Sequence, residues 1–77
     1  MTRTAATTRT VAFAFNPFAY EQSEALIIGA QTWTARRAAA GTGHITAEAL
    51  NEAIDAFEAM SADEQFAAAA TCAGLLG

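Results

Sequence analysis

The feature that most constrains the fold is an amphipathic segment in the second half of the chain. Five apolar residues recur along one face at helical spacing: Leu50, Ala53, Ile54, Phe57 and Met60. Glu48, Glu52 and Asp55 lie on the opposite face, about one turn apart, with Glu58 at its margin. An apolar stripe with this period indicates a helix that packs one side on a core.

The ends of this helix are also marked in the sequence. Thr46 is of a residue type that favours helix N-caps, so we predict a helix over 46–60. Ser61 is followed by Glu64, three residues later, which is the pattern of a capping box. A further helix is therefore predicted over 62–76, with an apolar face made of Phe66, Ala69, Ala70, Ala73 and Leu76. Because almost no loop separates these helices, they are expected to form a corner or hairpin.

Upstream, a longer helix is predicted over 17–40. Asn16 can cap it, and proline suits a first helical position. Ser23 is a second possible start. The stripe of Leu26, Ala30 and Trp33 is apolar, and Gly29 beside it would allow close packing. Residues 25–33 could instead be a strand, although the flanking residues favour a helix.

The N-terminal part of the sequence has a different residue pattern. Residues 1–8 are small, polar and threonine-rich, which predicts a flexible arm. Over 9–16, Val11, Phe13 and Phe15 alternate with small residues, and a period of two predicts a β-strand. The expected fold is therefore a single, mainly α domain with a short N-terminal strand, in the order β-α-α-α.

A lone strand leaves its backbone groups without partners. Two copies of the chain could pair their strands in a dimer, with Val11, Phe13 and Phe15 as the dimerisation residues. The strand could also add to a sheet edge of another protein, or pair with residues 25–33. We favour the homodimer, because a chain of 77 residues buries little area alone.

Charge divides the chain into two unequal halves. Residues 1–41 carry about +2, and residues 42–77 carry six acidic residues and no basic one, about −6. A nucleic-acid binder needs a basic patch, so no direct nucleic-acid binding is predicted. No apolar run is long enough to span a membrane. The single cysteine, Cys72, fits a reducing interior, and we predict a cytoplasmic location.

Few residues are of the types that catalyse reactions or bind metals. One histidine, His44, and one cysteine supply too few ligands for a usual zinc site, so neither a metal nor a cofactor is predicted. Arg36 and Arg37 could grip an anion, but positive charge also suits a helix end. Residues 41–43 form only a Gly-x-Gly, which is a weak signal. We therefore predict that the chain is not an enzyme.

The acidic residues are the candidate binding site. Like charges one turn apart cost helix stability, so the array is expected to serve a partner with a basic surface. The alternative is an ordinary solvated helix face. The predicted partner-binding residues are Glu48, Glu52, Asp55, Glu58, Asp63 and Glu64.

In its small size, its acidity and its lack of a catalytic motif, the chain resembles the small phage-encoded anti-CRISPR proteins. The resemblance rests on the face of Glu48, Glu52, Asp55 and Glu58. The resemblance implies an inhibitor that blocks DNA binding or recruitment by a CRISPR effector. That group shares no single fold, so no residue roles are carried over. The alternative function is a non-catalytic dimeric module, such as an adaptor, an assembly factor or an antitoxin-like protein, which would use the strand and the helix of 17–40.

Overall fold

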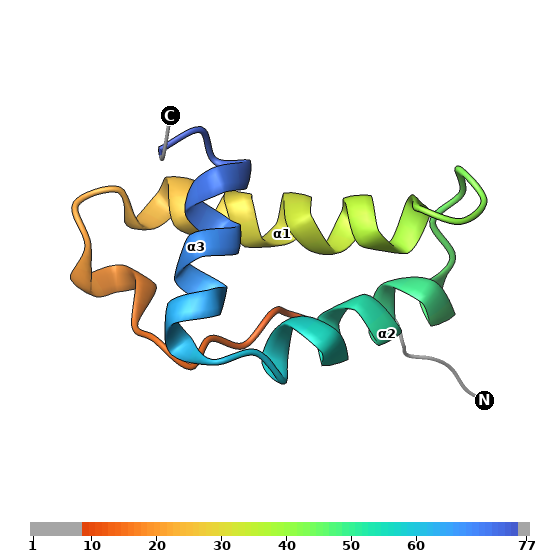
Figure 1. The fold of residues 1–77 in the computed structure, drawn as a ribbon, viewed down its shortest axis with the longest axis horizontal. Coiled ribbons are helices and arrows are strands. Elements are labelled where there is room, and N and C mark those ends of the chain that lie inside the picture. Colours follow the sequence, from red (N-terminus) through yellow and green to blue (C-terminus); the bar gives the residue numbers. More distant parts are fainter. Residues whose placement is uncertain (1–8, 76–77) are drawn as a thin grey trace.

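The structure is a computed structural model that describes residues 9–75. Its elements in that range are a 3-10 turn η2 (Pro17–Ala19) and the helices α1 (Ser23–Ala39), α2 (Ala47–Glu58) and α3 (Ala62–Cys72). In Figure 1, α1 lies above α2, a loop joins them at one end, and α3 crosses in front. Both α2 and α3 pack mainly on α1 and only slightly on each other. The two shorter helices therefore meet as a corner, and α1 fills the space between them.

The predicted caps of α2 and α3 are confirmed. The Thr46 hydroxyl accepts a hydrogen bond from the Ala49 amide at 3.0 Å. At Ser61 both halves of the capping box are present, because the Ser61 amide donates to Glu64 Oε1 at 2.9 Å and the Glu64 amide donates back at 3.2 Å. These pairs satisfy amides that have no partner within a helix. Each helix therefore begins where its local sequence specifies.

The boundaries of α1 differ from the first prediction. Asn16 caps only the short turn η2, through the Phe18 amide at 3.1 Å. The α-helix begins at Ser23, the second predicted start. Helix α2 ends at Glu58, and α3 ends at Cys72, shortly before Gly74 with φ +78°. Leu76 lies outside the described residues.

The core forms where the three helices meet. Leu26 and Ala30 of α1, Phe57 of α2, and Ala69 and Ala70 of α3 are all buried there. These residues belong to the predicted apolar stripes. The alternative in which residues 25–33 form a strand is wrong, because they lie within α1.

Gly29 explains how closely α1 and α3 approach. A Cβ atom built at Gly29 would overlap the carbonyl oxygen of Ala69 and lie 3.1 Å from the Cβ of Ala73. Any other residue would therefore push the helices apart. The close packing expected at Gly29 is present, and it is made against α3.

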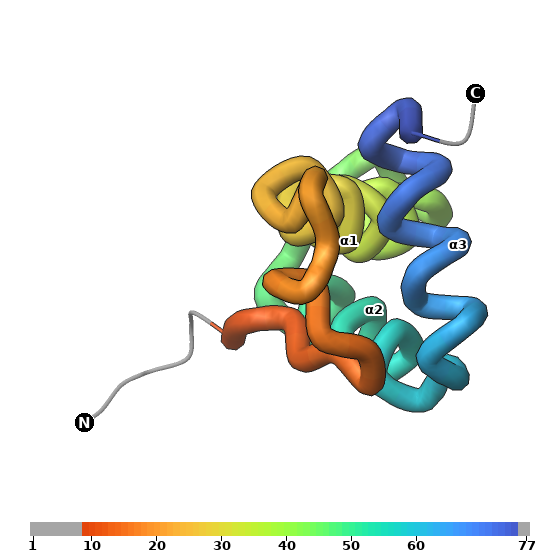
Figure 2. Tube along the Cα trace, turned by 90° about the vertical axis from the view of Figure 1, so that its left-hand side faces the viewer, coloured from red at the N-terminus to blue at the C-terminus, as the bar shows by residue number. Residues whose placement is uncertain are grey.

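The predicted N-terminal strand is wrong, and so is the β-α-α-α fold. Over 9–75 the structure contains no β-strand. Residues 9–16 form an irregular segment that lies beside α2 (Figure 2). The period of two is nevertheless real, since Val11, Phe13 and Phe15 are half-buried and the alanines between them are exposed. The pattern thus reflects the burial of alternate side chains against helices rather than the pairing of a strand in a sheet.

Side chains supply the hydrogen bonds that a neighbouring strand would have given. The Ala12 amide donates to Glu58 Oε2 at 3.3 Å, and the Ala14 amide donates to Gln65 Oε1 at 2.6 Å. Inter-chain pairing, addition to a sheet edge and pairing with 25–33 are three ways in which a strand could obtain such partners. Because α2 and α3 provide them, the reason for a strand-paired dimer is removed. The predicted arm, 1–8, lies outside the described residues.

The predicted dimerisation residues instead pack within the chain. The Phe13 ring lies edge-on to Phe57, with centroids 5.8 Å apart, and Phe15 meets Phe66 at the same distance. Val11 also packs against the core cluster. The apolar area predicted for an interface between copies is therefore used to cover the chain's own helices.

Candidate functional site

Helix α2 presents carboxylates on the side that faces away from the core. Glu48, Glu52 and Asp55 are exposed, whereas Ala53, Ile54 and Phe57 are buried on the opposite side. We call Glu48, Glu52 and Asp55 the acidic face. The rise of an α-helix places its first and last members about 10 Å apart along the axis. The Thr46 cap and the buried stripe fix the helix, so these charges are held in a defined row.

Arg9 neutralises one end of this row. Its Nη1 lies 2.7 Å from Asp55 Oδ1, and its Nη2 lies 3.3 Å from Glu58 Oε1. Nη1 also donates to the Asn51 carbonyl at 3.1 Å. Within the described range, both ion pairs are made by this arginine. Glu48 and Glu52 make no ion pair with the described residues, and the Asp55 side chain remains 67% exposed.

Two of the six predicted partner-binding residues have structural roles. Glu58 is half-buried and holds both Arg9 and the Ala12 amide. Glu64 completes the capping box of α3. Asp63, in the first turn of α3, is exposed. The carboxylates that remain available to a partner are therefore Asp63 and the acidic face.

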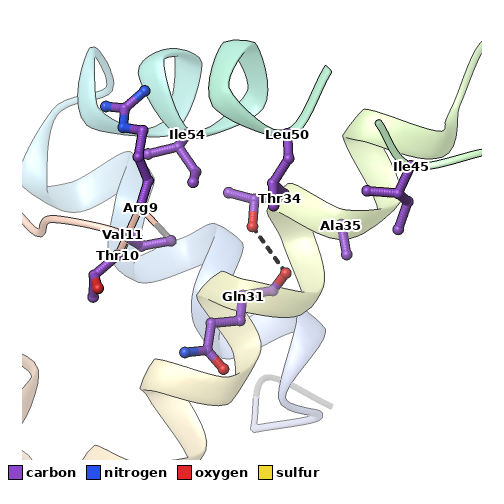
Figure 3. Close-up of a pocket in the computed structure, with 9 residues that line it drawn as sticks. All are labelled: Arg9, Thr10, Val11, Gln31, Thr34, Ala35, Ile45, Leu50 and Ile54. Carbon is purple, nitrogen blue, oxygen red and sulfur yellow. Dashed lines mark hydrogen bonds between the residues drawn. The ribbon is translucent and has the colours of Figure 1, made fainter. Parts of the chain in front are cut away.

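On the side of α2 opposite Glu48 and Glu52 lies a groove between α1, α2 and the N-terminal segment. Its larger part is a cavity of about 380 Å³, drawn in Figure 3. A second cavity of about 170 Å³ continues it, since Thr10, Val11 and Gln31 line both. We call the two together the apolar groove. Its apolar lining consists of Val11, Phe13, Phe18, Ile27, Ala35, Ile45, Leu50 and Ile54.

Little polar chemistry faces this groove. Among the described residues, Arg9 is the one charged residue in its lining, and it is already engaged by Asp55 and Glu58. Thr34 is buried, and its hydroxyl donates to the Gln31 carbonyl at 2.9 Å. The groove is therefore suited to an apolar group rather than to a charged small molecule.

The remaining candidates are placed apart from one another. The Arg37 guanidinium lies over the Trp33 ring, 5.6 Å from its centroid, and Arg36 Nη1 is 4.0 Å from Cys72 Sγ. The loop at His44 is closed by Thr42, whose hydroxyl accepts from the His44 amide at 3.1 Å. No three potential ligand side chains in residues 9–75 gather as a metal site. None of the helices in that range is long and apolar enough to cross a membrane.

Gln65 has a structural role that its place in the sequence did not predict. It is 1% exposed, and its amide group donates to the carbonyls of Phe57 and Met60 at 2.9 and 3.4 Å while accepting from Ala14. It thus ties the N-terminal segment to both shorter helices. The sequence did contain one sign that Gln65 is buried. It precedes Phe66 by one residue and Ala69 by four, so it lies at the edge of the apolar stripe of α3.

We expect Arg9→Gln to lower the free energy of unfolding by about 0.5–1 kcal/mol, because both of its ion pairs are partly exposed to solvent. The difference in unfolding free energy between Arg9→Gln and the unaltered chain should almost vanish at about 1 M salt, where surface charges are screened. Urea unfolding at low and high salt measures both values. Arg36→Gln is the matched control: the Arg36 guanidinium lies 4.0 Å from Cys72 Sγ and makes no ion pair with the described residues, so this variant removes the same charge and should lack the salt dependence. An Arg9 effect that persists in high salt would contradict the pairing.

Comparison of the chain with protein-family models, curated proteins and solved structures found no match. What the protein does must therefore be inferred from its own residues.

Proposed function

We propose that this chain is a small, non-catalytic binding protein that docks its acidic face on a basic, nucleic-acid-binding surface of a protein complex. A CRISPR effector is one such complex. Occupying that surface would block DNA binding or recruitment, so the chain would act as an inhibitor. In this proposal it works in the cytoplasm of a bacterium or a phage-infected host.

The observation that carries the proposal is the row of Glu48, Glu52 and Asp55 on one exposed side of a fixed helix. Like charges at this spacing destabilise a helix by a few tenths of a kcal/mol per pair. Arg9 relieves this repulsion at Asp55 and not at Glu48 or Glu52. The unrelieved repulsion is what a cationic partner would remove on binding.

The net negative charge of the chain would also favour the rapid association that an inhibitor needs. The chain carries a net charge of −4, so a basic groove would attract it over several ångströms and speed its association. Nucleic acid is recognised by the same cationic groups through its phosphates. The chain and the nucleic acid would therefore compete for one surface.

The test starts with affinity capture from the source cells and purification of the captured protein. We expect that protein to bind DNA, and the chain to compete with the DNA. Neutralising the acidic face with Glu48→Gln and Glu52→Gln should weaken inhibition at least tenfold, and helix content measured by circular dichroism should be unchanged.

Glu21→Gln with Glu24→Gln is the matched control, since it changes the net charge equally and lies outside the acidic face. It should inhibit almost as well as the unaltered chain. Equal losses in both double variants would show a net-charge effect without a docking face. A captured protein that binds no nucleic acid, or one that is indifferent to Glu48 and Glu52, would refute the proposal.

A further inference from the structure

The last turn of α2 favours a cation beside it. Asp55 and Glu58 belong to this turn, where the negative end of the helix dipole disfavours carboxylates. The turn contains no basic residue of its own. A positive charge supplied from another part of the chain, or from a partner, is therefore attracted by two carboxylates and by the helix end together.

Arg9 supplies this charge, and its contacts define the shape of the site. Nη1 lies 2.7 Å from Asp55 Oδ1 and donates to the Asn51 carbonyl at 3.1 Å, while Nη2 donates to Glu58 Oε1 at 3.3 Å. We call these three acceptors the arginine site. They converge on both terminal nitrogens of one planar guanidinium, whereas a lysine ammonium has a single nitrogen. The site therefore selects arginine over lysine.

The guanidinium can leave the arginine site while the N-terminal segment stays in place. Figure 3 shows the Arg9 side chain reaching from that segment toward α2. It is 36% exposed, and ion pairs at such exposure are weak. The segment has separate attachments, since Phe13 packs against the core and the Ala14 amide donates to the buried Gln65 at 2.6 Å. Release of Arg9 therefore requires the rotation of one exposed side chain and leaves the core covered.

We propose that Arg9 is an autoinhibitory contact on the acidic face, and that an arginine of the basic partner displaces it from the arginine site. This rests on the proposed function and names the side chain that the partner presents at the Asp55 end. In the free chain that end is filled by Arg9, whereas Glu48 and Glu52 make no ion pair with the described residues. A partner surface that carries only lysine replaces Arg9 less well, so the contact raises the specificity of docking.

The direct test uses fluorescently labelled peptides of about eight residues, a length that spans the acidic face when extended. One peptide consists of arginine and the other of lysine, and fluorescence anisotropy at low salt measures their binding. Arg9→Gln should tighten binding of the arginine peptide about two- to fivefold, the factor by which a weak ion pair changes an equilibrium constant. The lysine peptide should gain less, because an ammonium does not reproduce the contacts of the guanidinium.

Two further variants locate the effect. Arg36→Gln is the matched control, since it removes the same charge and Arg36 makes no ion pair with the described residues. It should tighten binding of the arginine peptide only slightly, through the net charge. Asp55→Asn changes a side chain that is 67% exposed, so circular dichroism should show the same helix content. In the Asp55→Asn background, Arg9→Gln should tighten binding no more than Arg36→Gln does.

Nuclear magnetic resonance of the unaltered chain distinguishes displacement from attraction alone. When the arginine peptide is added, the Nε–H signal of Arg9 should shift toward the position of a free arginine, and the signal of Arg36 should not. The Ala14 amide should remain protected from hydrogen exchange, because the segment stays in place. This measurement requires no substitution, so it is decisive even if a variant unfolds.

The outcomes separate the two proposals. If Arg9→Gln and Arg36→Gln change the affinity equally, or if both peptides gain equally, Arg9 does not compete for an arginine site and the inference fails. An arginine peptide that does not bind, or that leaves the Arg9 signal unchanged at saturation, would also overturn it. The proposed function would survive those results as long as the captured protein still depends on Glu48 and Glu52. If the captured protein ignores those two residues, the proposed function itself fails.

Discussion

Replacing Gly29 by alanine is expected to lower the free energy of unfolding by about 2–3 kcal/mol, as overpacking does in a close-packed core. The added methyl group would overlap the Ala69 carbonyl oxygen and lie 2.9 Å from the carbonyl carbon. These are backbone atoms, so no side chain can rotate to make room. The better helix propensity of alanine, about 1 kcal/mol, offsets only part of the cost.

Urea unfolding followed by circular dichroism measures this change. Gly41→Ala is the matched control, because no atom lies within 4 Å of a Cβ built at Gly41. It should change stability by less than about 0.5 kcal/mol, as surface substitutions usually do. If Gly29→Ala proved as neutral as Gly41→Ala, α1 and α3 would not approach as closely as described.

Replacing Gln65 by leucine should cost about 2–3 kcal/mol, because its hydrogen bonds are lost with little change in volume. The amide group of Gln65 contacts the Phe57 and Met60 carbonyls and the Ala14 amide, and the side chain is buried. Leucine can neither donate to the carbonyls nor accept from Ala14. The N-terminal segment would lose one of its two backbone attachments to α2 and α3.

Hydrogen exchange distinguishes this loss from general destabilisation. The Ala14 amide should exchange much faster in Gln65→Leu, relative to the amides in the middle of α1, than in the unaltered chain. Gln31→Leu is the control, since Gln31 is exposed on α1 and its replacement should leave Ala14 protected. An unchanged Ala14 amide in Gln65→Leu would mean that Glu58 and the phenylalanine contacts suffice to hold the segment.

The candidate site was only partly predictable. The spacing of Glu48, Glu52 and Asp55 placed them on one side of a helix, and they lie there. The pairing of Asp55 with Arg9 was not visible in the sequence, because 46 residues separate Arg9 from Asp55 and no local rule joins them. The structural roles of Glu58 and Gln65 were hidden for the same reason. The apolar groove was missed because it is formed by three segments that are distant in sequence.

Local sequence by itself determined where α2 and α3 begin, whereas α1 begins at Ser23 without a side-chain cap. A cap such as Thr46 or Ser61 bonds to an amide only three residues away, so its effect does not depend on the rest of the fold. The apolar stripes are equally local, since helical geometry alone places Ile54 and Phe57 on one side. These features specify the helices and the faces that they bury.

Tertiary structure decided what residues 9–16 became. Alternation of Val11, Phe13 and Phe15 requires an extended chain with one covered side, and a helix surface can cover that side as a sheet does. The difference lies in which groups accept from the Ala12 and Ala14 amides. Here the acceptors are Glu58 and Gln65, 46 and 51 residues away, and only packing of α2 and α3 on α1 brings them within reach.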